Sequence, residues 1–267
     1  MAILDFTSSK KAGTLIDAMF DKPPFTLQGK LLAPPLTKNP RTVGTAFGYA
    51  MGLQLWNFNR DLVREFPLVA EDGVKGDRKR KQFLKDFNQR KEAFLKGQLD
   101  IAELMPDCMV LAWLENVARS HQNFPNSQIF DTAEEDVKDL QCLVELVDRA
   151  SFTAVRRCIL YPRFGQSSLD LKGADADFII DDTLMEIKTT KSLEFEREYF
   201  RQLMGYYILN KRENNMYGKL EKLGIYFSRF GKLFTFPIPM MRGEEKDAWE
   251  KIEAAIEKYK RPWVDYI

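Results

Sequence analysis

Asp177, Glu186 and Lys188 are three charged residues whose types and spacing suit hydrolytic chemistry. Asp177 opens a short apolar run, and Glu186 and Lys188 lie two residues apart in the next one, so a strand there would point both side chains to one face. A tight turn between the two runs would bring Asp177 beside Glu186. Two carboxylates that converge in this way repel each other unless a cation lies between them. Because oxygen ligands suit hard cations, the pattern predicts a site for Mg²⁺ or Mn²⁺.

Lys188 and Ile187 add to this chemistry. A lysine is a poor structural choice within such a sheet, but beside two acids it can orient a water or stabilise charge that develops on a phosphate oxygen. The backbone carbonyl of Ile187 could supply one more ligand. An E-x-K triplet alone arises easily by chance, and residues 244–246 form another at the start of a charged helix. A solvent-exposed hairpin with ordinary ion pairs is therefore the alternative interpretation.

An aspartate, eight residues and then E-x-K, each half flanked by apolar strand residues, resembles the PD-(D/E)xK phosphodiesterase superfamily. A second motif follows, because Gln202 and Tyr206 match the QxxxY motif of its RecB-like exonuclease branch, and their i, i+4 spacing places both on one helical face. The resemblance covers residues 155–211. It implies that Asp177 and Glu186 bind the metal, that Lys188 positions the attacking water, and that Gln202 and Tyr206 approach the metal site and the DNA backbone.

The chain departs from the superfamily pattern in three ways. Ala176 stands where the superfamily has proline, and residues 44–58 lack the histidine ligand that many RecB-like members carry on an early helix. The third acid is open: Glu115 shares a helical face with apolar side chains and is preferred to Glu145, which lies off the apolar stripe of its own helix. Asp175, two residues before the aspartate of the motif, is an alternative ligand on the same strand face.

Basic residues gather in one segment of this nearly neutral chain. Residues 75–97 carry nine Lys and Arg against three acids, a surplus of six in a chain whose net charge is +1. Such clustering is typical of phosphate-backbone binding, and a solvated helix face is the alternative. From this segment we select Arg78, Lys79 and Lys81 as nucleic-acid-binding residues. Lys191 and Arg197, just beyond the E-x-K strand, are two further candidates.

The positions of the predicted elements favour an α/β (α+β) fold. The first 40 residues read as loops and turns, broken by prolines. Apolar periodicity then predicts helices at 45–58, 75–97, 106–120 and 133–150, strands at 155–161, 177–180 and 184–188, a helix at 193–211, a hairpin of 223–229 with 232–237, and a helix at 244–259. The superfamily resemblance implies a mixed central sheet of the α-β-β-β-α-β restriction-endonuclease-like type with an N-terminal helical extension. We divide the chain into a mainly helical region, 1–130, and a nuclease core, 131–267, packed together as one unit.

Composition excludes several other classes. Three widely spaced cysteines without a CxxC pair argue against a disulfide framework, a structural zinc site or an iron–sulfur cluster. His121 is the single histidine and falls in a polar segment, so a multi-histidine metal site cannot form within one chain. The common glycine-rich phosphate-binding motifs are missing. No apolar run reaches the roughly 18 residues that a membrane span needs, and we expect a cytoplasmic protein without membrane contact.

These observations together predict a divalent-metal-dependent DNA nuclease, with an exonuclease as the favoured form. A non-catalytic nucleic-acid-binding module that retains the nuclease fold, or a protein-interaction scaffold, is the alternative. The sequence leaves open single- or double-stranded DNA, RNA as a substrate, endonuclease or exonuclease action, polarity and oligomeric state. A helicase or an annealing protein is the kind of partner we would expect.

Overall fold

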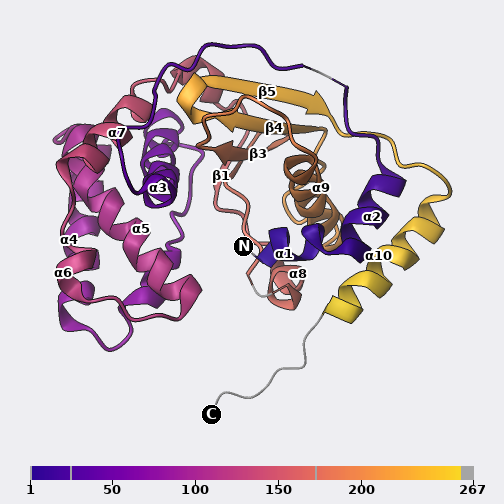
Figure 1. Cartoon of the computed structure of the whole chain (residues 1–267), viewed down its shortest axis with the longest axis horizontal. Helices are drawn as coiled ribbons and strands as arrows, with labels where there is room; N and C mark the ends of the chain where they lie inside the picture. Colours follow the sequence, from indigo (N-terminus) through magenta and orange to yellow (C-terminus); the bar gives the residue numbers. More distant parts are fainter. Residues whose placement is uncertain (1, 25, 172, 260–267) are drawn as a thin grey trace.

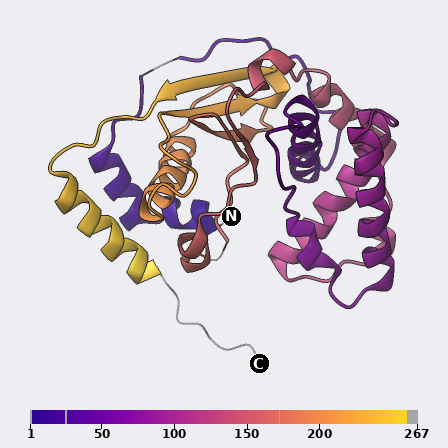
Figure 2. The ribbon, with the colours of Figure 1, turned by 180° about the vertical axis from the view of Figure 1, so that it is seen from behind.

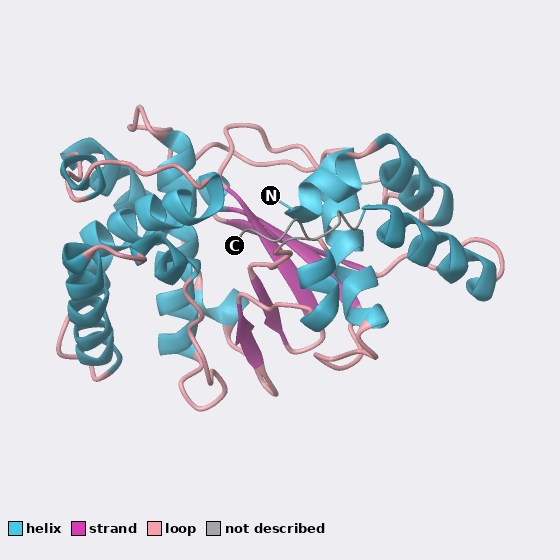
Figure 3. Ribbon diagram, turned by 90° about the horizontal axis from the view of Figure 1, so that it is seen from below, coloured by secondary structure: helices cyan, strands magenta, loops and turns pink. Residues whose placement is uncertain are grey.

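A central sheet with helices on both faces organises the chain. The computed structural model describes residues 2–24, 26–171 and 173–259, and within them one five-stranded mixed sheet forms (Figures 1 and 3). The helices on one side of the sheet are α3 (Pro40–Phe58), α4 (Arg78–Leu95), α5 (Met105–Ser120), α6 (Asn126–Ile129) and α7 (Glu134–Val144). Those on the other side are α1 (Ala2–Ser8), α2 (Lys10–Met19), α8 (Gly165–Asp170), α9 (Arg197–Arg212) and α10 (Glu245–Tyr259).

The strands follow one another across the sheet in sequence order. They are β1 (Cys158–Leu160), β2 (Phe178–Ile180), β3 (Thr183–Lys188), β4 (Lys222–Phe227) and β5 (Lys232–Pro237). Neighbouring strands run antiparallel except β3 and β4, which are parallel. A parallel pair needs a crossover connection, and α9 provides it. The sequence therefore predicted the mixed α/β class, the tight turn between β2 and β3 and the hairpin of β4 and β5.

Both faces of the sheet are buried, because alternate side chains pack against different helices. Phe178 and Met185 belong to the apolar core shared with α3, α5 and α7. Ile179 and Leu184 belong to the core shared with α1, α2, α9 and α10. Strands buried on both sides have apolar residues at successive positions, as these do. Glu186 shares the face of Leu184 and so lies toward α9.

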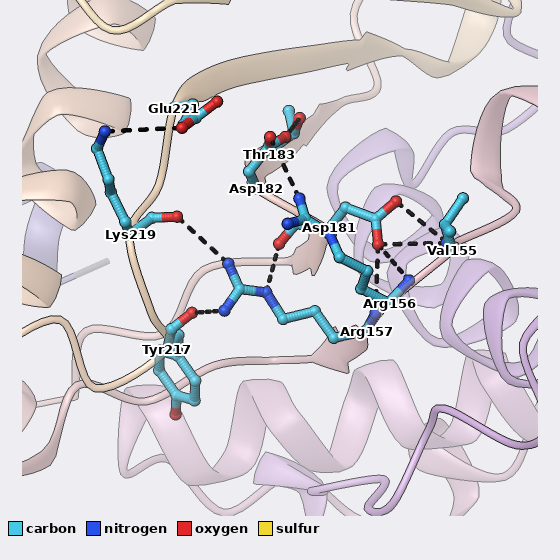
Figure 4. A network of polar contacts seen from close by, with 9 residues as sticks. All are labelled: Val155, Arg156, Arg157, Asp181, Asp182, Thr183, Tyr217, Lys219 and Glu221. Carbon is cyan, nitrogen blue, oxygen red and sulfur yellow. Dashed lines mark hydrogen bonds and ion pairs between the residues drawn. The ribbon is translucent and has the colours of Figure 1, made fainter.

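A two-residue turn between β2 and β3 sets the register of the strands that carry the motif acids (Figure 4). Asp181 has a left-handed backbone (φ 52°), and its carboxylate accepts hydrogen bonds of 2.6–3.2 Å from the N–H groups of residues 155–157. The Arg157 guanidinium donates to the carbonyls of Asp181, Tyr217 and Lys219. The strand predicted at 155–161 is therefore too long: it begins at Cys158 because the three residues before it bind the turn.

The helices predicted at 45–58, 75–97, 106–120, 193–211 and 244–259 are present with shifted ends. The helix predicted at 133–150 is wrong in its last turns, since α7 ends at Val144. The Leu146 carbonyl accepts a hydrogen bond of 3.2 Å from the Tyr226 hydroxyl, and Asp148 caps a separate 3₁₀ turn at Arg149–Phe152. Tertiary contacts thus break a helix that local periodicity would continue.

The loops predicted for the first 40 residues are wrong for α1 and α2. Ile3, Phe6 and Ile16 bury their side chains in the core beneath α9, and α1 contacts α9 directly. By contrast α7, which follows residue 130, packs against α3 and α5. Packing therefore crosses the boundary that we placed at residue 130.

The segment from α2 to α3 passes along β5 and joins the two groups of helices (Figures 1 and 2). Arg229 and Asp139 form a fully buried ion pair of 2.8 Å beneath it. The backbone N–H groups of Leu32 and Ala33 both donate to the Arg229 carbonyl at 3.0 Å. These bonds fix the path by which the chain enters α3. Within the described residues, no helix is long and apolar enough to cross a membrane.

Candidate functional site

Asp177, Glu186 and Lys188 line one cavity of about 420 Å³, where β3 ends between α3 and α5. Its lining includes four of the five acids that the sequence offered as ligands, namely Glu115, Asp175, Asp177 and Glu186. Ile187 and Lys188 also line it, and Glu145 does not. Glu145 is exposed on the surface, as its position off the apolar stripe predicted. Residues from three separate parts of the chain thus converge on one pocket.

Asp177 lies at the entry to β2, where the strand register places it beside β3. Its Oδ2 accepts a hydrogen bond of 2.6 Å from the backbone N–H of Ile187. Burial, and then the nearby charge of Glu186, hold the pKa of Asp177 well above its usual range. The Ile187 N–H and the Lys188 ammonium act in the opposite direction but do not outweigh them. The predicted convergence of the two carboxylates is therefore present.

Glu186, Lys188 and Gln202 form a closed ring of hydrogen bonds. Glu186 Oε1 accepts from Gln202 Nε2 at 2.6 Å and from Lys188 Nζ at 3.2 Å. Lys188 Nζ also donates to Gln202 Oε1 at 2.7 Å and lies 4.9 Å from the centre of the Tyr199 ring. One amide from α9 thus binds both the acid and the base of the E-x-K motif, and it holds the ammonium at the wall of the cavity.

The second oxygen of Glu186 is unusual. Glu186 is 7% exposed, and its Oε2 is buried without a hydrogen-bond partner among the described residues. A buried carboxylate oxygen without a partner is costly, so such a group points to a cation. Mg²⁺ is often held by one or two carboxylates and several waters, and Asp177 with Glu186 fits that requirement. The described residues contain no group of three or more His, Cys, Asp and Glu side chains arranged for a metal.

Glu115, the preferred third acid, lines the cavity, but both of its carboxylate oxygens accept hydrogen bonds from other side chains. The Tyr49 hydroxyl donates to Oε2 at 2.5 Å, and Arg119 Nε donates to Oε1 at 2.6 Å. The same guanidinium donates to Asp175 Oδ2 at 2.8 Å. Arg119 therefore joins the two acids that the sequence offered as additional ligands. A role for Glu115 as a third ligand stays a prediction.

Tyr206 lies next to Gln202 on α9, as the i, i+4 spacing predicted. Its hydroxyl donates to the Asp175 carbonyl at 2.7 Å and accepts from Gln202 Nε2 at 3.2 Å. Tyr206 and Gln202 are only 2% and 3% exposed. The motif resemblance implied contacts with the DNA backbone. In the structure the polar atoms of both side chains bind other groups of the protein.

The predicted nucleic-acid-binding residues lie outside the cavity. Arg78, Lys79 and Lys81, which we call the α4 basic face, are exposed on a helix at the far side of the molecule from α9 (Figures 1 and 2). Arg197 pairs with Asp17 at 3.0 Å, and Lys191 is exposed.

The basic segment also contains cations that serve the fold. Arg80 is 5% exposed and donates to the carbonyls of Gly73 and Phe124. Arg90 forms an ion pair of 2.8 Å with Asp107. Fewer positive charges of this helix are therefore available to a ligand than its composition suggests.

Arg119 and Tyr49 are site residues that sequence reasoning missed. Arg119 follows Glu115 by four residues on one helix, which is a pairing signal that was available. Tyr49 gave no such signal, because 66 residues separate it from Glu115.

No protein-family model, curated protein or solved structure matches the chain.

Proposed function

We propose that the chain is a divalent-metal-dependent nuclease of the PD-(D/E)xK type that hydrolyses phosphodiester bonds in DNA, in the manner of a RecB-like exonuclease. The observation that carries the proposal is the buried, unpartnered Oε2 of Glu186 in a cavity that also contains Asp177 and Lys188. A cation there would relieve the repulsion that raises the pKa of Asp177.

Asp177 and Glu186 would hold Mg²⁺ or Mn²⁺, with the Ile187 carbonyl as a further oxygen. When bound, such an ion polarises a phosphate oxygen and lowers the pKa of a water molecule. Lys188 donates toward the attacking water or toward the charge that develops on the phosphate. Gln202 fixes the ammonium of Lys188 through its Oε1, so that the lysine reaches the reacting group without reorganisation.

A module that only binds nucleic acid is the competing proposal, and the charges of the cavity disfavour it. Two carboxylates that face a bound strand repel its phosphates and weaken binding unless a cation intervenes. A pure binding module would gain nothing from them. A protein-interaction scaffold likewise has no use for a buried acid whose oxygen lacks a partner.

Nuclease assays with matched variants test the proposal. End-labelled single- and double-stranded DNA is incubated with the protein in Mg²⁺, in Mn²⁺ and in EDTA. We expect cleavage only with metal, and a loss of about 100-fold or more in Asp177→Ala and Glu186→Ala, as expected when a metal ligand is removed. Glu145→Ala removes an exposed acid outside the cavity and serves as the control. Wild-type rates in both ligand variants would rule out this site, and absence of cleavage under every condition would rule out the activity.

A further inference from the structure

The wall of the cavity opposite the motif acids is one face of α3. The residues of α3 that line it recur every four positions over the first half of the helix: Pro40, Arg41, Gly44, Thr45, Gly48 and Tyr49. This spacing places them along one stripe that starts at the amino terminus of the helix. A substrate bound at Asp177 and Glu186 would therefore lie next to this stripe.

Two glycines leave part of the stripe without side chains. A Cβ at Gly48 would meet nothing within 4 Å, and one at Gly44 would meet only Thr189, at 3.5 Å. Gly52, one turn further along, differs, because a Cβ there would lie 2.3 Å from the Tyr161 hydroxyl oxygen. Packing explains Gly52 but not the other two, even though glycine is unfavourable within a helix. Gly44 and Gly48 leave space inside the cavity.

The amino terminus of α3 is suited to bind an anion. Asn39 occupies the N-cap without a side-chain cap hydrogen bond. Pro40 has no N–H, and the Val43 N–H donates to the Asn39 carbonyl. The first-turn donors that α3 leaves for a ligand are therefore the N–H groups of Arg41 and Thr42. The positive end of a 19-residue helix favours negative charge. Arg41, in the same turn, is exposed on the cavity and forms no ion pair with any described residue.

An independent observation at the same cavity points to a ligand. Glu186 Oε2 is buried, unpartnered and part of the lining, so a cation that bound there would face the anion-binding end of α3. The cavity volume of about 420 Å³ falls within the range of about 300–1,000 Å³ that encloses a ligand of drug size. A cavity of this volume holds roughly one nucleotide unit, which favours an unpaired strand over a base pair with its two backbones.

We infer that the first half of α3 is a subsite for a single strand of nucleic acid. Arg41 and the first-turn N–H groups bind the phosphate next to the one at the acids, and the glycine stripe provides room for the sugar-phosphate backbone between them. This inference rests on the proposed function for the identity of the neighbouring phosphate. It adds a strand preference and a specificity residue that the motifs do not contain.

Binding and cleavage are measured separately, so that the subsite and the activity can fail independently. Fluorescence anisotropy in Ca²⁺, a hard cation that carboxylates bind, compares a short oligothymidylate with a duplex of the same length, and cleavage of both is followed in Mg²⁺. We expect tighter binding and faster cleavage of the single strand. Arg41→Ala should weaken its binding roughly tenfold, as expected for a lost charge-assisted phosphate contact, and reduce the salt slope by about 1. Lys38→Ala removes an exposed charge that does not line the cavity, and its affinity should stay within about twofold of wild type.

Gly48→Leu tests the stripe. The side chain enters open space, so the melting temperature should not fall, while single-strand binding and cleavage should be lost. Gly48→Ala adds one methyl group and repeats the test if the larger side chain lowers the melting temperature.

Three results would overturn the subsite: equal losses in Arg41→Ala and Lys38→Ala, full activity in a folded Gly48 variant, or a duplex that binds and is cut as well as the single strand. Binding that depends on Arg41 without cleavage would retain the subsite and refute the nuclease. A wild-type protein that binds neither oligonucleotide would refute both.

Discussion

Replacing Gln202 with alanine tests whether one amide holds the E-x-K motif in place. The substitution removes hydrogen bonds to Glu186, Lys188 and Tyr206, of which the first two involve charged groups. Gln202 is only 3% exposed, so its loss should lower the stability of the fold as well as any activity.

The magnitude follows from the contacts. A hydrogen bond to a charged group contributes about 1.5–3 kcal/mol, and Glu186 and Lys188 can still pair directly after the amide is gone. Because the losses are not additive, we expect a destabilisation of about 2–4 kcal/mol. At about 2.1 cal/mol/K per residue, the unfolding entropy of a chain this long converts this to a fall in melting temperature of about 4–7 °C.

Differential scanning fluorimetry in EDTA measures this fall without any assumption about activity. Gln141→Ala is the matched control, because Gln141 is an exposed helical glutamine that donates to a neighbouring glutamate at 3.0 Å. Its melting temperature should stay within about 1 °C of wild type, as for most surface substitutions. If the protein is a nuclease, kcat should also fall by about 100-fold in Gln202→Ala, because Lys188 loses its fixed position. If Gln202→Ala has the same melting temperature as Gln141→Ala, the proposed role of the hydrogen-bond ring is refuted.

Three further predictions follow from the same contacts. Asp177→Asn should flatten the pH dependence of the metal-free protein: a raised carboxyl pKa means that the folded state keeps its proton longer, so wild-type stability falls as pH rises above about 4. Thermal melts at pH 5 and pH 8 check this, and parallel profiles of the two proteins would contradict it. Tyr206→Phe leaves the buried Asp175 carbonyl without its hydrogen bond and should cost about 1–2 kcal/mol in chemical denaturation; an unchanged midpoint argues against the contact. Charge reversal of the α4 basic face should weaken DNA binding and make its salt dependence shallower without altering single-turnover cleavage. A constant salt slope would leave that face as a solvated surface.

The part of the site that the sequence predicted is the part built from neighbours along the chain. Asp177, Glu186 and Lys188 fall on two strands joined by a two-residue turn, and period-2 alternation is enough to place them together. Gln202 and Tyr206 needed only the helical period. The sequence could not show how deeply these side chains are buried, because burial depends on what packs over them.

The part that the sequence could not predict comes from distant segments. Arg119 joins Glu115 to Asp175, which lies 56 residues away, and α3 forms a wall of the cavity although its motif histidine is missing. The helical state of α1 and α2 was missed for a similar reason. These two helices pack against each other, but most of what covers their apolar faces comes from α9 and α10, far along the chain.

That arrangement has a consequence for synthesis on the ribosome. Ile3, Phe6 and Ile16 leave the exit tunnel before α9, which covers them and follows roughly 190 residues later, a delay of about 10–40 s at ordinary elongation rates. During this interval their side chains stay exposed to water and to neighbouring chains. A nascent chain that stops before α9 therefore presents an apolar surface of the kind that chaperones bind. This surface is covered only when the α9 segment has been synthesised and has folded over it.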